Sequence, residues 1–245
     1  MEPIFQSRLP YGAADRRPLP GIQPLDPAEW LVQDDAFAGQ MRERERLLSE
    51  SRDKVIALQP EARPAAEELL ETVLAFLSTR EGYAVDGDRV CRPDGVTVTV
   101  DAADVMGTLG RLVQEDLCLM EKREGEAEHV LTGAVLCFPS AWTLAQKFGH
   151  PLLRIHVPVH EYDEGIGRRV QRLFDGVQPG RPLWRFNWLP TDDTSLFRPK
   201  LEFADKIRRE GLPYLRSERQ TILRLPRTRA VVFGIHTFLV RIEDA

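Results

Sequence analysis

Three of the five histidines lie close together in the sequence, at His150, His156 and His160. His156 stands in an apolar segment bracketed by prolines, which would hold a neutral imidazole in a fixed position. Such a ring can be an axial ligand of haem iron, or a structural histidine that hydrogen-bonds a backbone carbonyl. His150 and His160 lie beside expected turns, and no Cys or acidic residue recurs at a spacing that would complete a zinc site. His156 is therefore the candidate metal ligand of this stretch.

Arg185 and Asn187 alternate with three aromatic residues between positions 184 and 188. Successive side chains of a strand point to opposite faces, so the pattern predicts an aromatic face toward the core. The Arg/Asn face then looks either into solvent or into a pocket. On a pocket wall a guanidinium could hold a haem propionate or polarise dioxygen.

A second group of charged residues, Glu218, Arg219 and Arg224, lies near the end of the chain. We expect a strand to begin at about residue 221, with Arg224 on the same face as Gln220. A buried carboxylate at position 218 could receive an ammonium group of a substrate. An exposed group of ion pairs would instead contribute little, and the residues alone leave both interpretations open.

The first half of the chain predicts an extended arm followed by helices. Six prolines among the first 30 residues block regular hydrogen bonding, and Asp26 before Pro27 indicates a helix start. The hydrophobic pattern predicts helices over 34–58 and 65–80 and from Asp101 to about 114, with a strand over 96–100 and a short apolar segment over 116–122.

The second half predicts most of the sheet. Strands are expected over 130–138, 180–190, 221–225 and 230–242, a short helix over 141–148 capped by Ser140, an irregular segment over 150–159 and a helix over 161–177. A three-stranded meander behind a helix makes the expected class α+β. We expect residues 1–80 to form an arm and helices packed on a core of residues 81–245, as a single compact unit.

The totals describe an ordinary globular protein of 245 residues, 42% hydrophobic and 29% charged. The net charge of −5 gives no electrostatic case for binding nucleic acid or an anionic membrane. No apolar run is long enough to span a bilayer and the N-terminus has no apolar signal core, so a cytoplasmic location is expected.

No electron carrier is encoded by a motif in this chain. The cysteines Cys91, Cys118 and Cys137 are too widely spaced for an iron–sulfur centre, and neither GxGxxG nor GxxxxGKS is present. Electrons for any redox chemistry must therefore come from another chain.

Five motifs occur in one order along the chain: FPSAW at 138–142, Lys147-Phe-Gly, Ile155-His-Val-Pro-Val, Arg185-Phe-Asn-Trp, and the run RSERQTILRLP from Arg216. ERQT-x-x-RLP is the most particular of them. In this order the set resembles the haem-dependent oxidative N-demethylases, and specifically the haem-binding alpha subunit of dimethylamine monooxygenase-like systems.

The resemblance implies a PAS-like antiparallel sheet with helices on one side enclosing haem b. It also implies an NADPH-driven reaction in which dioxygen oxidises the methyl group of a small secondary alkylamine such as dimethylamine, releasing formaldehyde. Reductase partner subunits would carry FMN, an iron–sulfur cluster and folate.

The resemblance also distributes roles among residues. It makes His156 the axial ligand, from the helix side, and draws polar distal groups from the strands. The implied cofactor-binding candidates are Arg185, Asn187 and Arg219. The implied catalytic candidates are Glu218, Arg224 and His236. His236 enters because this chain has His236-Thr-Phe near the last strand, where relatives tend to have an Arg or a similar residue followed by Thr-Tyr.

Two other functions fit the same residues. One is a non-catalytic haem PAS-type sensor of a gas or of redox state, and the other is a ligand-binding or interaction protein without haem. A haem absorption band separates the protein without haem from the N-demethylase and the sensor. Formaldehyde release separates the N-demethylase from the sensor.

Overall fold

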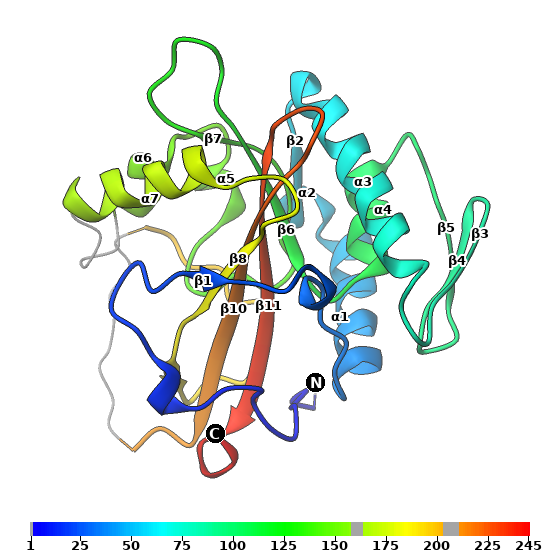
Figure 1. Cartoon of the computed structure of the whole chain (residues 1–245). Helices are drawn as coiled ribbons and strands as arrows, with labels where there is room; N and C mark the ends of the chain where they lie inside the picture. Colours follow the sequence, from blue (N-terminus) through cyan, green and yellow to red (C-terminus); the bar gives the residue numbers. More distant parts are fainter. Residues whose placement is uncertain (1, 158–163, 203–210) are drawn as a thin grey trace.

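A computed structural model describes residues 2–157, 164–202 and 211–245 (Figure 1). Its centre is an antiparallel sheet in the order β1-β8-β10-β11-β6-β7-β2, with β9 paired to β10. The strands are β1 (Gln23–Pro24), β2 (Ile56–Leu58), β6 (Asp116–Glu121), β7 (Val130–Val135), β8 (Leu183–Phe186), β9 (Leu189–Thr191), β10 (Tyr214–Arg224) and β11 (Val231–Arg241). A small separate sheet contains β3 (Ala84–Asp86), β4 (Arg89–Cys91) and β5 (Thr97–Thr99).

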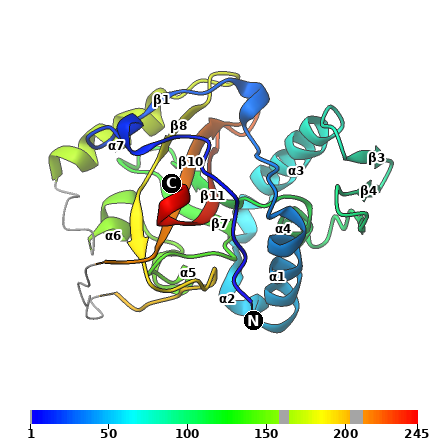
Figure 2. The same ribbon diagram turned by 90° about the horizontal axis from the view of Figure 1, so that it is seen from below.

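Helices cover both faces of the large sheet, and the predicted α+β class is confirmed (Figure 2). One face of the sheet, which we call the first face, packs against α1 (Phe37–Glu50), α3 (Arg63–Leu77) and α4 (Val105–Leu112). Helix α2 (Arg52–Val55) lies at the sheet edge. The second face packs on α5 (Leu144–Lys147), α6 (Leu152–His156) and α7 (Glu164–Gly176).

The middle strand β6 shows why both faces need cover. Its side chains alternate between two cores, with Leu117 and Leu119 in the first and Cys118 and Met120 in the second. A strand that is apolar on both sides must be buried on both. This differs from the expected arrangement with helices on one side of the sheet.

The predicted meander of the last three strands is present. β8, β10 and β11 are adjacent and antiparallel, and Pro226 and Arg227 lie in the loop that joins the two long strands. β10 begins at Tyr214, seven residues before the predicted start at 221. The ERQT motif therefore lies within the strand, and its alternate side chains point to opposite faces.

Three other predictions about elements are wrong. The helix predicted over 34–58 ends before Ile56, because Ile56–Leu58 pair with β7 in the sheet. The apolar segment 116–122, to which the sequence pattern assigned no secondary structure, forms strand β6 between β11 and β7. The caps also differ: Asp104, not Asp101, accepts the bond from Gly107 N at the start of α4, and α5 begins after Thr143 rather than Ser140.

The segment predicted to be irregular contains the short helix α6. Pro151 stands at its N-cap, where a missing N–H costs nothing, and its carbonyl accepts the first helical bond from Ile155 N at 3.0 Å. Residues 158 and 159 lie outside the described part of the chain.

The N-terminal arm lies across the sheet rather than apart from it. Gln6 pairs with Leu239 through backbone and side chain, and the ring of Tyr11 stacks on Phe186 at 4.0 Å between centroids. The Asp26 side chain accepts a hydrogen bond from Ala28 N at the start of a 3-10 helix of one turn, Pro27–Glu29, and so caps it as predicted. The arm also contributes β1, which pairs with β8.

Candidate functional site

A buried polar group lies on the second face of the sheet and is centred on Glu218. Asn187 forms two hydrogen bonds with Glu218. Its Nδ2 donates to the Glu218 carboxylate at 2.8 Å, and its Oδ1 accepts from the Glu218 backbone N–H at 2.8 Å. Gln220 Nε2 donates to the same carboxylate oxygen at 3.2 Å. The strand alternation of β10 places these groups together, and Asn187 follows directly after β8.

The carboxyl group of Glu218 is almost completely removed from solvent, with 6% of the residue exposed. Burial raises its pKa, and the charge of Arg216 opposes that rise from 3.9 Å. Arg216 is itself buried and donates to the carbonyls of Phe138 at 2.6 Å and Leu196 at 3.1 Å. A buried base is thus held next to a fixed positive charge.

Three buried polar atoms around Glu218 have no hydrogen-bond partner: Arg185 Nε, Arg216 Nε and Thr237 Oγ1. Arg216 is two residues away on the same strand, Thr237 is directly opposite on β11, and Arg185 is opposite Gln220 on β8. Leaving such an atom unsatisfied costs about 1–3 kcal/mol. Five other buried polar atoms of the described residues share this property, at Trp30, Arg44, Glu115, Arg198 and Thr221, so the group around Glu218 stands out because three such atoms surround one carboxylate.

His156 lies on α6, which covers this same face. Its Nδ1 hydrogen-bonds the Leu152 carbonyl at 2.8 Å, so Nδ1 carries the proton and Nε2 the lone pair. Burial and the positive charges of Lys147 and Arg185 together lower its pKa to about 4, although the hydrogen bond to Leu152 opposes the shift. At neutral pH the ring is therefore a neutral imidazole, the form that binds a metal.

The two histidines that are near His156 in the sequence, His150 and His160, are not part of its described environment. His150 is exposed at the end of the short loop before α6. His160 lies outside the described residues. Lys147 is buried and donates through Nζ to the Ile155 carbonyl, which ties α5 to the helix that carries His156.

Arg224 shares the second face but serves another element. Its guanidinium donates to the carbonyls of Phe174, Val177 and Arg229, two of them at the end of α7. The last carbonyls of a helix lack intrahelical partners and attract positive charge. Arg224 therefore closes the C-terminal end of α7.

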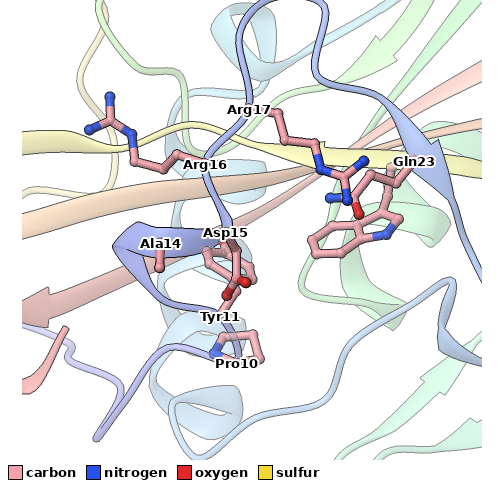
Figure 3. A pocket seen from close by; sticks show the side chains of 8 residues that line it. Pro10, Tyr11, Ala14, Asp15, Arg16, Arg17 and Gln23 are labelled. Atoms are coloured by element: carbon pink, nitrogen blue, oxygen red, sulfur yellow. The ribbon is translucent and has the colours of Figure 1, made fainter.

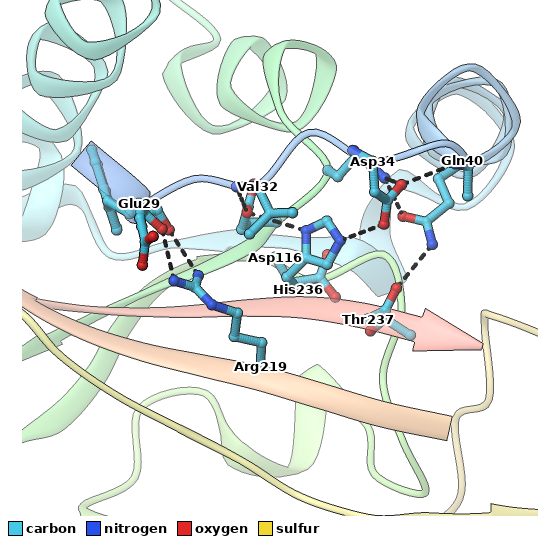
Figure 4. A network of polar contacts seen from close by, with 12 residues as sticks. Glu29, Val32, Asp34, Gln40, Asp116, Arg219, His236 and Thr237 are labelled. Atoms are coloured by element: carbon cyan, nitrogen blue, oxygen red, sulfur yellow. Dashed lines mark hydrogen bonds and ion pairs between the residues drawn. The ribbon is translucent and has the colours of Figure 1, made fainter. Parts of the chain in front are cut away.

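Arg219 and His236 are opposite each other in the register of β10 and β11 and project from the first face (Figure 4). Strand alternation places Glu218 on the other face. Arg219 donates to the carbonyls of Glu29 at 2.7 Å and Trp30 at 3.2 Å, and so fastens the arm. The structure thus brings His156, Arg185, Asn187 and Glu218 to one side of the sheet. It places Arg219 and His236 on the other side, and it engages Arg224, on the same side as Glu218, with the end of α7.

His236 is completely buried between two carboxylates (Figure 4). Its Nε2 lies 2.9 Å from Asp34 Oδ2 and its Nδ1 lies 3.2 Å from Glu115 Oε1. Burial alone would lower its pKa, but the hydrogen bonds and charges of the two carboxylates raise it to about 9. The ring is an imidazolium at neutral pH, unlike His156.

Arg216 and Thr237 are the residues of this site that sequence reasoning missed. Both follow from strand alternation once β10 is known to begin at Tyr214, because position 216 shares a face with 218. No local pattern marks Thr237, since only the register of β10 with β11 brings it opposite Glu218.

Two surface hollows of about 330 and 310 Å³ lie away from this group, near the arm and α7. Within the described residues no three His, Cys, Asp or Glu side chains are placed to hold a metal ion together. Also within the described residues, no helix is long and apolar enough to cross a bilayer.

Comparison with known families gives a match over residues 21–245 to the family described as haem-dependent oxidative N-demethylase, alpha subunit-like. The match includes every element of both faces and all of the polar group around Glu218. The family description names haem dependence and an oxidative role, and an alpha subunit implies further subunits. The chain belongs to the family of haem-dependent oxidative N-demethylase alpha subunit-like proteins.

Proposed function

We propose that this chain is the haem-binding catalytic subunit of an oxidative N-demethylase that acts on a small secondary alkylamine of the dimethylamine type. The observation that carries the proposal is the second face of the sheet. It has a neutral histidine on the covering helix, and a buried carboxylate surrounded by unsatisfied donors on the strands. Family membership supports the same reaction class.

The donor set on this face fits haem b. His156 provides a neutral Nε2 whose orientation is fixed by the Nδ1 bond to Leu152, the usual second contact of a ligating histidine. Arg185 is half-buried and provides a buried, unsatisfied Nε, suited to a propionate. His156 would hold the iron, and Arg185 would hold a propionate. The sheet is PAS-like in this proposal.

Bound haem supplies dioxygen activation. In the overall reaction dioxygen, two electrons and two protons convert the N-methyl amine into formaldehyde, water and the demethylated amine. The electrons come from NADPH through cytoplasmic partner subunits with FMN, an iron–sulfur cluster and folate, since the motifs for these carriers are missing from this chain.

Glu218 has the role of amine receptor and base. Burial raises its pKa, so its carboxylate takes up the proton of an incoming ammonium group and leaves the amine nitrogen with its lone pair. Asn187 and Gln220 hold the carboxylate in one orientation. Arg219, Arg224 and His236 take no part in this proposal, because their side chains bind other elements.

Haem reconstitution of the purified chain tests the proposal. We expect a Soret band from the wild type, its loss in His156→Ala, and its retention in His150→Ala, whose ring is exposed nearby. Formaldehyde release from dimethylamine with a chemical reductant then tests turnover, with Glu218→Gln expected to lose at least about tenfold in rate, equivalent to 1.4 kcal/mol. A chain that never binds haem would refute the proposal. Haem binding without formaldehyde would make the protein a sensor.

A further inference from the structure

Four exposed arginines form a basic surface on this acidic chain. Arg16 and Arg17 lie on the arm, and Arg169 and Arg172 lie on the outer side of α7. All four side chains are exposed, and within the described residues none forms an ion pair or a side-chain hydrogen bond. The chain as a whole carries a net charge of −5, so this surface differs in sign from the average of the molecule.

The two pairs belong to one region because the arm bends over α7. Pro20, three residues after Arg17, lines one hollow together with Arg169 and Arg172. Arg16 and Arg17 line the other hollow, beside Tyr11 and Trp184. Figure 2 shows α7 beside β1 and the arm, away from the small sheet. We call these four residues the arginine surface.

The geometry favours a large anionic partner over a small anion. Arg16 and Arg17 leave the arm in different directions (Figure 3), so their guanidiniums do not converge on one point. Recognition of a single carboxylate or phosphate needs convergent donors. Spread charges instead attract an oppositely charged protein surface and accelerate its association.

The position of the surface connects it with the proposed haem site. α7 packs against α6, which carries His156, and its inner side chains Val170 and Phe174 belong to the core of the second face. A protein docked on the outer side of α7 therefore lies over the layer that covers the site. Electron-transfer complexes use small, polar contacts of this kind.

We infer that the arginine surface is the docking site of the electron-donating partner, and that this partner presents an acidic surface. The inference rests on the proposed function, which needs two electrons per turnover from outside the chain. One electron at a time passes from the reduced partner to the ferric haem, which becomes ferrous, and no bond is formed between the proteins.

A reduced two-iron ferredoxin of strongly negative net charge is a suitable probe, mixed with the haem-loaded chain without oxygen while the Soret band is followed. We expect the bimolecular rate to fall with rising salt, and to fall at least about tenfold in Arg169→Glu/Arg172→Glu. The matched control is Arg42→Glu/Arg89→Glu, two exposed arginines on α1 and β4 that also lack ion pairs within the described residues. Its rate should change less than twofold.

Dithionite separates the inference from the proposed function, because this small reductant needs no docking site. The proposed function and the inference both hold under two conditions. Dithionite must support formaldehyde release in every variant, and the ferredoxin must reduce the Arg169→Glu/Arg172→Glu variant more slowly than the control variant. If turnover fails with dithionite, the proposed function fails, and calorimetric binding of the oxidised ferredoxin to the chain still tests the surface. The inference would be overturned if the reduction rate fell equally in the α7 variant and in the control. It would also be overturned if the chain did not bind the ferredoxin, or if it bound phosphatidylserine vesicles and not the ferredoxin.

Discussion

Replacing His236 by glutamine tests whether the buried histidine between Asp34 and Glu115 stabilises the fold. The imidazolium on strand β11 bridges the segment before α1 and the connection between α4 and β6, and the residue is completely buried. Glutamine keeps a polar group of similar reach and removes the charge. We expect His236→Gln to be less stable than wild type while retaining any haem signal, because its ring lies on the first face and the haem candidates lie on the second.

The size of the effect follows from the pKa of His236. It rises from 6.5 to about 9 on folding, and each unit corresponds to roughly 1.4 kcal/mol, so the charged ring contributes roughly 3 kcal/mol. Because the pKa is raised, this contribution is fully present below pH 6.5 and is lost as the pH rises to 9. The stability difference between wild type and variant should therefore be largest at pH 6 and should shrink toward pH 9.5.

Urea unfolding at several pH values between 5.5 and 9.5 measures this difference directly. His129→Gln is the matched control, since burial lowers the pKa of His129. A lowered pKa means that wild-type stability falls as the ring is protonated at acidic pH, so the control should show a pH dependence of opposite sign. A difference for His236→Gln that does not change between pH 6 and 9 would refute the ion-pair assignment. Loss of the Soret band in a folded His236→Gln would return this residue to the haem site.

Three further substitutions test the packing around the site by urea unfolding at pH 7. Arg224→Ala should cost about 2–3 kcal/mol, because the carbonyls at the end of α7 lose a charged donor. Glu68→Ala should cost about 2 kcal/mol through three lost bonds to the hairpin loop, two of them from backbone N–H groups. Gly234→Ala should cost about 1–3 kcal/mol, since a Cβ there would lie 2.6 Å from Thr221 Oγ1. An unchanged midpoint in any of them would contradict the corresponding contact.

Local patterns predicted the elements whose burial is decided by their own residues. The alternation from Trp184 to Trp188 gave the correct faces for Arg185 and Asn187, because period two is a property of the strand itself. Helix α6 has only five residues, too few for a helical period to be recognised, and prolines at both sides favoured an irregular segment. Strand β2 depends on pairing with β7, which no local pattern contains.

The start of β10 decided how much of the site could be predicted. With a strand from residue 221, Glu218 and Arg219 appear as neighbours in one charged group. With the observed start at Tyr214, alternation sends them to opposite faces. The partners of His236 lie 121 and 202 residues away in the sequence, so its role in holding the arm could be found only in three dimensions.

The two faces of the sheet treat buried charge in different ways, and this difference is the main argument for where the chemistry lies. On the first face the guanidinium of Arg219 is bound to two carbonyls, and both nitrogens of His236 face carboxylates, although Glu115 Oε2 and Thr221 Oγ1 have no hydrogen-bond partner there. On the second face Arg185 and Arg216 each keep a buried Nε without a partner beside a carboxylate whose pKa is raised. A group that only stabilises the fold gains from complete pairing, whereas a group that binds a ligand must keep bonds unmade until the ligand arrives. Arg219 and His236 therefore have the bonding of structural groups, whereas Arg185 and Arg216 have unmade bonds beside Glu218, which supports the proposed site on the second face.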